Sequence, residues 1–274
     1  MVFNSTATPL TEEAAAIEEL RAALGEVPRL SVGPPLDEPS LLLRFVRGYG
    51  CNVKEATKAF EAMMAYRVEH GIDAAREEMF AASPNDVQPQ PRWPIELPRF
   101  EPLVTLTGEG LVRPLGQSAE GNPATLVLLH HYDLKRVQKA GLTPLLVQLQ
   151  QYIDEWWWCE LCARSAAAGR LLARDDIIFV AKIGLFQFDI GCARIFSQVL
   201  AGAKHYPESV AHIMSVGNFR ALVAMYNAVI RPFMPQHTKE KILVFGRDLE
   251  SNTIRSGLNL EPATMEALLE RTAQ

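Results

Sequence analysis

The stretch DDIIFVAKIG (residues 175–184) decides the fold class. It is a short apolar run, rich in β-branched and aromatic residues, and it follows a long segment of helical composition at 143–170. Two further runs, ATLVLLHHY (124–132) and KILVFG (241–246), have the same character, and LVTLTGEG (103–110) resembles a strand followed by a turn. Buried strands separated by helices predict an α/β domain with a covered sheet.

The first eighty residues have a different, helical pattern. TEEAAAIEELRAAL (11–24) begins with Thr11 as a cap, and NVKEATKAFEAMMAYRVEHG (52–71) is bounded by a capping asparagine and a terminating glycine. Six prolines between 84 and 102 then indicate an extended connector. We therefore expect a helical N-terminal module at 11–83, a Pro-rich connector at 84–102 and a second domain at 103–274.

Composition excludes several functional classes. The net charge of −5 and pI near 5.8 disfavour a nucleic-acid-binding protein with a broad basic surface. Four scattered cysteines are too few for a disulfide scaffold in 274 residues. MVFNSTATPL lacks the pattern of a signal peptide, and no run of about 18 apolar residues predicts a transmembrane helix. We expect a monomeric cytoplasmic protein.

Candidate catalytic and metal-binding motifs are weak. WCELC (158–162) resembles a thioredoxin redox motif, but it lies inside a helical run instead of opening a helix after a strand. The pairs His130/His131 and His205/His212 are interpreted as structural; His130 and His131 end a strand pattern and are expected to point to opposite faces. The sequence therefore predicts no enzyme, no cofactor and no metal.

Two apolar features invite a ligand. Trp156, Trp157 and Trp158 cannot share one helical face, so we expect at least one ring to be exposed or to line a cavity. FRALVAMYNAVIRPFM (219–234) carries a broad apolar stripe, which indicates a helix that is deeply buried or that covers an apolar cavity and meets lipid. The stripe comprises Phe219, Leu222, Val223, Tyr226, Val229, Ile230 and Phe233.

KHYPESVAHI (204–213) poses the question of a binding site. Its proline followed by Glu208 is typical of a helix start, so the acid is either a helix opener or a group that faces a ligand.

The order of these segments resembles the CRAL-TRIO lipid-transfer family. LLLRFVRGYGCNVKEATKAFEAMMAYRVEHGID (41–73) is similar to that family's helical N-terminal module, with Tyr66-Arg67 at its Trp-Arg position. CARSAAAGRLLARDDIIFVAKIGL (162–185) and HYPESVAHIMSVGNFRALVAMYNAVIRPFMPQHTKEKILVFG (205–246) resemble its strand, Tyr-Pro-Glu step, gating helix and Thr-x-x-Lys strand entry. The resemblance implies a mixed sheet under an apolar pocket, closed by a gating helix at 219–234.

The resemblance also implies a headgroup site. Glu208, Thr238 and Lys241 stand where phosphatidylinositol-binding members hold the inositol phosphate. A carboxylate accepts from inositol hydroxyls, and a hydroxyl and an ammonium donate to phosphate. Tyr49 replaces a phosphate-contacting arginine of those members, and Asp176 and Ile178 replace strand residues of phosphatidylcholine binders.

We therefore expect a lipid-transfer protein that carries a phospholipid, phosphatidylinositol above all, and exchanges it while transiently peripheral on a membrane. Two alternatives stay open at this point. One is a lipid sensor that presents its ligand to a partner enzyme. The other is a carrier of a sterol, tocopherol or retinoid-like ligand without headgroup recognition, in which Glu208 is a helix opener, Thr238 a turn hydroxyl and Lys241 an exposed lysine.

Overall fold

The computed structural model describes residues 11–81, 91–108, 112–131, 133–181, 190–218, 223, 236–246, 248–249 and 251–273. Its helices are α1 (Thr11–Leu24), α2 (Pro39–Gly48), α3 (Val53–His70), α4 (Ile72–Phe80), α5 (Glu101–Thr107), α6 (Leu134–Lys139), α7 (Thr143–Ala168), α8 (Ile190–Leu200), α10 (Gln236–Lys241), α11 (Asn252–Leu258) and α12 (Pro262–Ala273). Short 3₁₀ turns are η1 (Pro94–Glu96), η2 (Pro98–Phe100), η3 (Leu129–His131) and η5 (Ala203–His205). The strands are β1 (Val112–Gln117), β2 (Pro123–Leu128), β3 (Arg174–Phe179), β4 (Val210–Val216) and β5 (Ile242–Val244).

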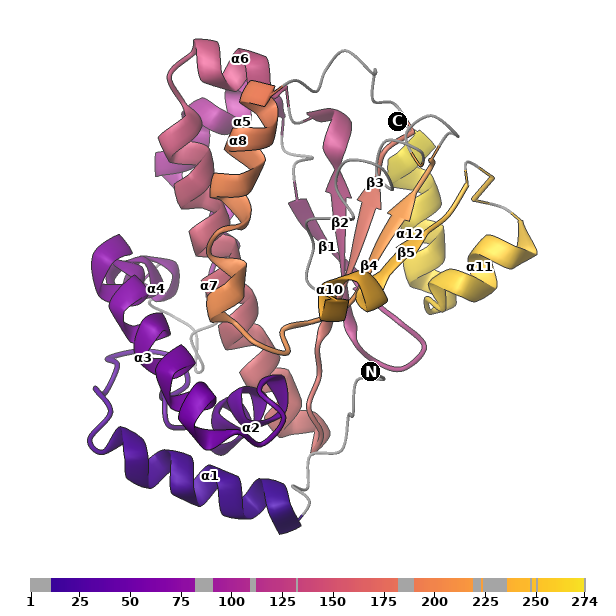
Figure 1. Cartoon of the computed structure of the whole chain (residues 1–274). Coiled ribbons are helices and arrows are strands. Elements are labelled where there is room, and N and C mark those ends of the chain that lie inside the picture. Colours follow the sequence, from indigo (N-terminus) through magenta and orange to yellow (C-terminus); the bar gives the residue numbers. More distant parts are fainter. Residues whose placement is uncertain are drawn as a thin grey trace.

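The five strands form one mixed sheet in the order β1-β2-β3-β4-β5 (Figure 1). β1 is antiparallel to β2, whereas β2, β3, β4 and β5 are mutually parallel. Parallel neighbours need crossover connections, and α8 supplies the one between β3 and β4 that the structure describes. The class predicted from the sequence, a mixed sheet with covering helices, is confirmed.

One face of the sheet is closed by the C-terminal helices. Alternate residues of β2, β3 and β4, such as Leu126, Ile177 and Met214, are almost fully buried against α11 and α12. These helices lie on the right of the sheet in Figure 1. This packing removes apolar surface from water and forms the core on this side of the sheet.

The other face points towards α7 and is called the α7 face here. Because side chains alternate along a strand, the residues that lie between the buried residues of β2, β3 and β4 point to the α7 face. In β2 to β5, five residues on this face are apolar and either half-buried or exposed: Val127, Ile178, Ile213, Ile242 and Val244. The register pairs Ile213 with Ile242, which places both on the same face. The α7 face is therefore an apolar wall that the described helices cover only in part.

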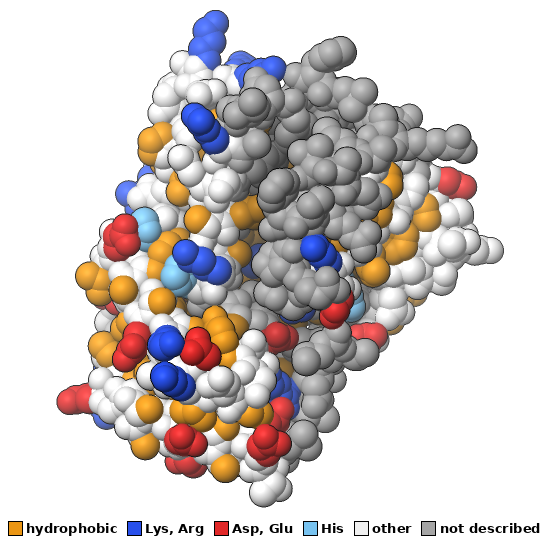
Figure 2. All heavy atoms as spheres, in the orientation of Figure 1, with side chains coloured by type: hydrophobic (Ala, Val, Ile, Leu, Met, Phe, Trp, Pro, Cys, Tyr) orange, Lys and Arg blue, Asp and Glu red, His pale blue; other side chains and the backbone are white. Residues whose placement is uncertain are grey.

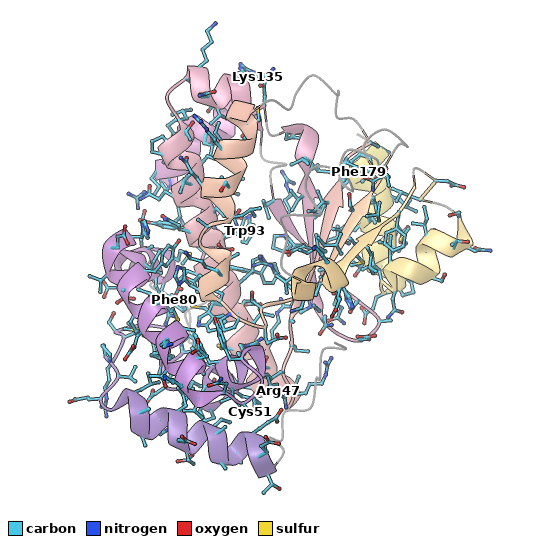
Figure 3. All side chains as sticks on the ribbon, in the orientation of Figure 1. Arg47, Cys51, Phe80, Trp93, Lys135 and Phe179 are labelled. Atoms are coloured by element: carbon cyan, nitrogen blue, oxygen red, sulfur yellow. The ribbon has the colours of Figure 1, made fainter. Side chains whose placement is uncertain are left out.

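The middle of helix α7, residues 152–159, is buried at every position, and this explains its sequence. Trp156 and Trp157 belong to the cluster that α7 forms with α5, α6 and α8, whereas Trp158 packs among the N-terminal helices. Trp93, labelled in Figure 3, meets Trp156 at a centroid distance of 4.8 Å. All three rings of the triplet are buried, so none is exposed and the helix has no solvent face at this point. The other arm of the expectation holds, because Trp157 lines a pocket beside Pro114 and Thr264.

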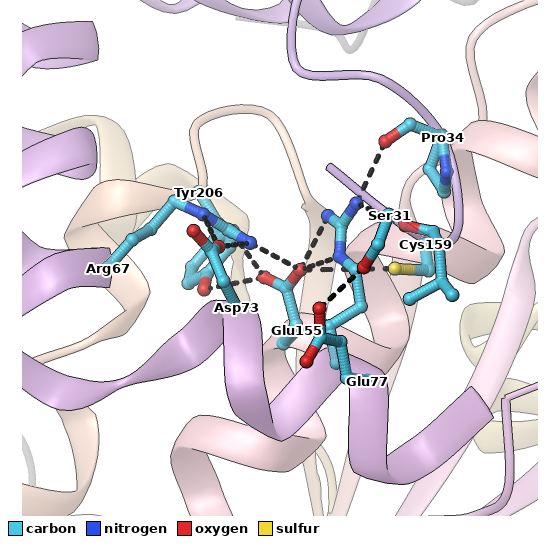
Figure 4. A network of polar contacts seen from close by, with 10 residues as sticks. Ser31, Pro34, Arg67, Asp73, Glu77, Glu155, Cys159 and Tyr206 are labelled. Atoms are coloured by element: carbon cyan, nitrogen blue, oxygen red, sulfur yellow. Dashed lines mark hydrogen bonds and ion pairs between the residues drawn. The ribbon is translucent and has the colours of Figure 1, made fainter. Parts of the chain in front are cut away.

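A buried ion cluster joins the N-terminal helices to α7 (Figure 4). The Glu155 carboxylate accepts from Arg67 Nη1 at 2.7 Å and from Arg76 Nε at 2.5 Å. It also accepts from the Tyr206 hydroxyl at 3.0 Å. Burial raises the pKa of Glu155, but the charges of Arg76 and Arg67 outweigh it and hold that pKa at about 2. The carboxylate is therefore ionised at neutral pH and neutralised by two cations.

Several sequence predictions are confirmed in detail. α1 covers 11–24, and α3 begins after Asn52, whose side chain accepts from the Glu55 amide, and ends at Gly71 in the left-handed region. The predicted helix at 143–170 is α7, and the strand at 175–184 is β3, which ends sooner at Phe179.

Other predictions are wrong. Residues 103–110 were expected to form a strand, but they contain most of α5, whose proline at the first turn and buried Leu103 and Thr107 at i and i+4 suit a helix. The predicted strand at 124–132 ends at Leu128, and η3 follows. No helix begins at the Tyr-Pro-Glu step: β4 starts at Val210, because its alternate residues fill the closed face of the sheet.

Some predictions lie outside the described residues. The gating stripe at 219–234 lies outside the described residues, apart from Val223, which is helical and half-buried. The first half of the 84–102 connector does as well, and its second half forms η1, η2 and the start of α5 instead of an extended chain. Among the described residues, no helix combines the length and apolar character needed to cross a membrane.

We predict that Glu155→Gln lowers the free energy of unfolding by about 3–5 kcal/mol, because it leaves Arg76 buried without a counter-charge and leaves Arg67 with only the half-exposed Asp73. Urea unfolding measures this. The control is Glu160→Gln on the same helix, whose partner Arg164 is 42% exposed, and it should cost less than about 1 kcal/mol. Equal effects of the two substitutions would contradict the role given to the cluster.

Candidate functional site

The turn from Tyr206 to Ser209, which links η5 to β4, has a strained backbone. Glu208 adopts φ 52°, in the left-handed region that a residue with a side chain rarely occupies. This costs about 1–2 kcal/mol. Arg44 Nη1 donates to the Glu208 carbonyl oxygen at 2.7 Å. A hydrogen bond from a charged donor contributes about 1.5–3 kcal/mol, so this one contact is enough to hold the strained conformation.

Helix α2 holds the turn from outside the second domain. Arg44 is fully buried and also donates through Nη2 to the Leu172 carbonyl at 2.7 Å and to Ser165 Oγ at 3.1 Å. Burial lowers the pKa of Arg44. Gly48, one turn further along α2, lies so close that a Cβ there would stand 2.9 Å from Pro207 Cβ.

The Glu208 carboxylate faces Lys241. Glu208 Oε2 and Lys241 Nζ are 3.6 Å apart, and their side chains are 24% and 21% exposed. The ammonium also donates to the Val210 carbonyl at 2.9 Å. β4 begins just after Glu208 and β5 just after Lys241, so the parallel strands bring both groups to the amino-terminal rim of the sheet.

The structure therefore brings together two of the three predicted headgroup residues. The third, Thr238, lies in α10 one turn before Lys241, and its side chain is outside the described part. Tyr49, which replaces a family arginine, is half-buried and ends α2 beside Gly48. This rim offers a carboxylate that accepts and an ammonium that donates, both partly open to a ligand.

The rim adjoins the apolar wall of the α7 face. Ile213 and Ile242, the paired residues of β4 and β5, are half-buried on that face, and Val244 follows at 39% exposure. An amphipathic molecule with its polar end at Glu208 and Lys241 would thus meet apolar side chains along the strands. Apolar surface beside a few convergent polar groups is part of the usual character of a ligand site.

A polar cluster interrupts the same face nearer β2. Arg174 Nε lies 3.0 Å from Asp176 Oδ1, and its Nη2 lies 3.7 Å from Asp154 Oδ1. Burial raises the pKa of Asp154 to about 6, although Arg174 and the amide of Gln150 act against it. Burial likewise raises the pKa of Asp176. Asp176, one of the two departures from choline-lipid binders, is therefore paired with an arginine, while the other, Ile178, belongs to the apolar wall.

The remaining candidate motifs have structural surroundings. Burial raises the pKa of Cys162 to about 11 and that of Cys159 further, so both are protonated thiols at neutral pH. His205 stacks on Tyr66, and His212 Nδ1 lies 2.8 Å from Asp175. Among the residues described, no group of three potential metal ligands occurs.

Sequence reasoning missed the supports of the rim. From the sequence alone, no ligand-site role is assigned to Arg44, Gly48 or Tyr206. A charged residue inside the apolar run LLLRFV, on a helix buried at almost every position, was the available signal, since such a charge requires partners. The identity of those partners depends on tertiary contacts that the sequence does not display.

Comparison with known proteins identifies the fold. No family model matches the chain, and no curated protein matches it in sequence. The crystal structure of Sfh5, a CRAL-TRIO protein, resembles it with a TM-score of 0.55 and 13% identity, over 97% of this chain and 98% of that one. At this identity the likeness shows the fold alone, and it agrees with the mixed sheet described above.

We predict that Gly48→Ala destabilises the protein by about 1–3 kcal/mol, because the new methyl group must displace Pro207. Helix propensity alone would give the opposite sign, with a gain of about 1 kcal/mol. Thermal or urea unfolding decides between them. The control is Gly246→Ala, where a Cβ meets nothing within 4 Å, and a stabilised Gly48→Ala protein would show that the turn is not tightly held.

Proposed function

We propose that this protein binds a phospholipid in an apolar pocket against the α7 face and transfers it between membranes, without covalent chemistry. The observation that carries the proposal is the juxtaposition of a partly exposed Glu208–Lys241 pair with the partly covered apolar wall of β3, β4 and β5. A polar headgroup and apolar chains require these two environments side by side. The likeness to Sfh5 supports the fold on which this proposal rests.

Phosphatidylinositol is the phospholipid that suits the rim best. Glu208 can accept from inositol hydroxyls, and Lys241 can donate to the phosphate, with Thr238 one helical turn away. Lys241 is now bonded to the Val210 carbonyl, so phosphate binding would exchange or extend this bond. The carboxylate near Lys241 argues against a purely anionic ligand and favours one that also carries hydroxyl donors.

Transfer requires contact with a membrane, because each CH₂ taken into water costs about 0.8 kcal/mol. The charge distribution supports such contact. α6 and the stretch 190–205 contain five of the 27 lysine and arginine residues and none of the 32 acidic residues. The rest of the chain therefore has 22 basic and 32 acidic residues. The five are Lys135, Arg136, Lys139, Arg194 and Lys204, and we call them the basic edge.

All five residues of the basic edge are exposed. In Figure 2 blue side chains gather at the top of the molecule, where Figure 1 places α6, and Lys135 projects away from the body in Figure 3. Leu200, at the end of α8, is 59% exposed. Basic residues near an anionic bilayer contribute about 1 kcal/mol each, and an exposed leucine can enter its interface.

The headgroup assignment is tested with Glu208→Gln and Lys241→Gln. Each should lower the ratio of bound phosphatidylinositol to bound phosphatidylcholine about tenfold, since a bond to a charged group contributes about 1.5–3 kcal/mol. The protein is loaded from vesicles containing both lipids, and the bound lipid is extracted and quantified by mass spectrometry. Lys239→Gln on the same helix is the control. An unchanged ratio in the folded variants would refute headgroup recognition at the rim.

The membrane contact is tested by charge reversal. Lys139→Glu with Arg194→Glu should weaken co-sedimentation with vesicles containing 30% phosphatidylserine at least about tenfold, and 0.5 M salt should weaken binding of the unmodified protein. The matched control, Lys54→Glu with Lys58→Glu, makes the same charge change on exposed positions of α3. If both pairs weaken binding equally, net charge and not the basic edge determines membrane contact.

A further inference from the structure

We propose that Arg44 is a positioning residue that sets the direction of the Glu208 carboxylate, so that the N-terminal helices determine headgroup selectivity. The inference rests on the proposed function, because it assumes that Glu208 contacts the headgroup. It goes beyond that function by assigning selectivity to a residue that is buried behind the site.

Arg44 holds three segments of the chain in fixed positions relative to one another. Its guanidinium donates to Ser165 at the end of α7, to the carbonyl of Leu172 before β3, and to the carbonyl of Glu208 before β4. These groups are 121 to 164 residues away in the chain. A planar guanidinium with several donors can hold such a set at once, which a lysine cannot do.

Because Arg44 fixes the carbonyl of Glu208, it also fixes the backbone conformation that orients the Glu208 side chain. At φ 52° the residue turns its carbonyl towards Arg44 while its carboxylate faces Lys241, 3.6 Å away. If the carbonyl were released, the residue would relax towards negative φ, which is the common region, and the carboxylate would leave Lys241. Strained backbone of this kind persists only where its surroundings over-determine it.

Two further contacts hold the same turn. Gly48 admits Pro207 against the end of α2, and Tyr206 donates to Glu155 at 3.0 Å. Arg47, three residues after Arg44 on the same helix, contacts Glu13 instead, at 2.9 and 3.0 Å within the N-terminal helices. Arg47 therefore provides a control that perturbs α2 through its ion pair with Glu13.

The experiment compares Arg44→Lys and Arg47→Lys in the full chain, each alone and combined with Glu208→Gln. The readout is the ratio of phosphatidylinositol to phosphatidylcholine taken from mixed vesicles, together with total lipid per folded protein. Arg44→Lys should lower the ratio about tenfold, which corresponds to a coupling of about 1.4 kcal/mol. Arg47→Lys should leave it unchanged, and Arg44→Lys should have no further effect when Glu208→Gln is present.

Every other outcome contradicts either the positioning role of Arg44 or the headgroup site itself. If Glu208→Gln lowers the ratio and Arg44→Lys does not, the positioning role is wrong and the headgroup site stands. If Arg44→Lys lowers the loading of both lipids equally, or adds fully to Glu208→Gln, its role is only structural. If Glu208→Gln itself keeps the ratio, the proposed headgroup site is wrong, and the inference fails with it.

A second variant keeps the test decisive where Arg44→Lys does not fold. Gly48→Ala pushes on Pro207 next to Glu208 while the buried guanidinium stays in place. It should lower the ratio of the two lipids in the folded fraction, and Gly246→Ala should not. A folded Gly48→Ala protein with the original ratio would show that the position of the turn does not control selectivity.

Discussion

The buried carboxylate of Glu155 is the constraint on which the rest of the structure depends. It lies in the middle of α7, where only ionised partners make burial tolerable, and it takes them from α3 and α4 as Arg67 and Arg76. Arg76 extends the cluster to the Pro34 carbonyl, at 2.8 Å, in the loop before α2. The N-terminal helices therefore cannot separate from α7 without exposing an uncompensated charge on each side. Their packing provides apolar burial, but this cluster fixes which surfaces meet.

The same cluster reaches the candidate site through one residue. Tyr206 donates to Glu155 and stands two residues before Glu208. The turn is thus held at three points, by Arg44 and Gly48 of α2 and by Glu155 of α7. A strained residue with a partly exposed carboxylate is thereby attached to a junction held by buried ion pairs. Rigid support of this kind limits the entropy lost when a polar ligand is bound. The function proposed for the rim thus depends on elements far from it in sequence.

The sequence predicted what local patterns control. The capped helix α3, the long helix α7 and the apolar strand β3 were all expected, because caps and periodicity act within a few residues. The helix α5 was predicted as a strand because of its β-branched residues, and a helix was predicted where β4 begins because of the proline and acid before it. In both segments tertiary packing outweighed these local preferences. Glu208 and Lys241 followed from a resemblance. Arg44 and Gly48 could not, because their roles depend on contacts across more than a hundred residues.

The arrangement of charge and apolar surface bears on how a lipid would leave. α8 returns from the end of β3 to the start of β4, so the basic edge runs alongside the strands and not across their ends (Figure 1). β4 has seven residues and spans about 20 Å, somewhat more than the hydrocarbon depth of one leaflet, about 15 Å. A lipid with its headgroup at the amino-terminal rim and its chains along the α7 face would then lie side-on to a docked membrane. Chains that meet the bilayer along their length avoid the full cost of hydration at any one moment, and this favours exchange over storage.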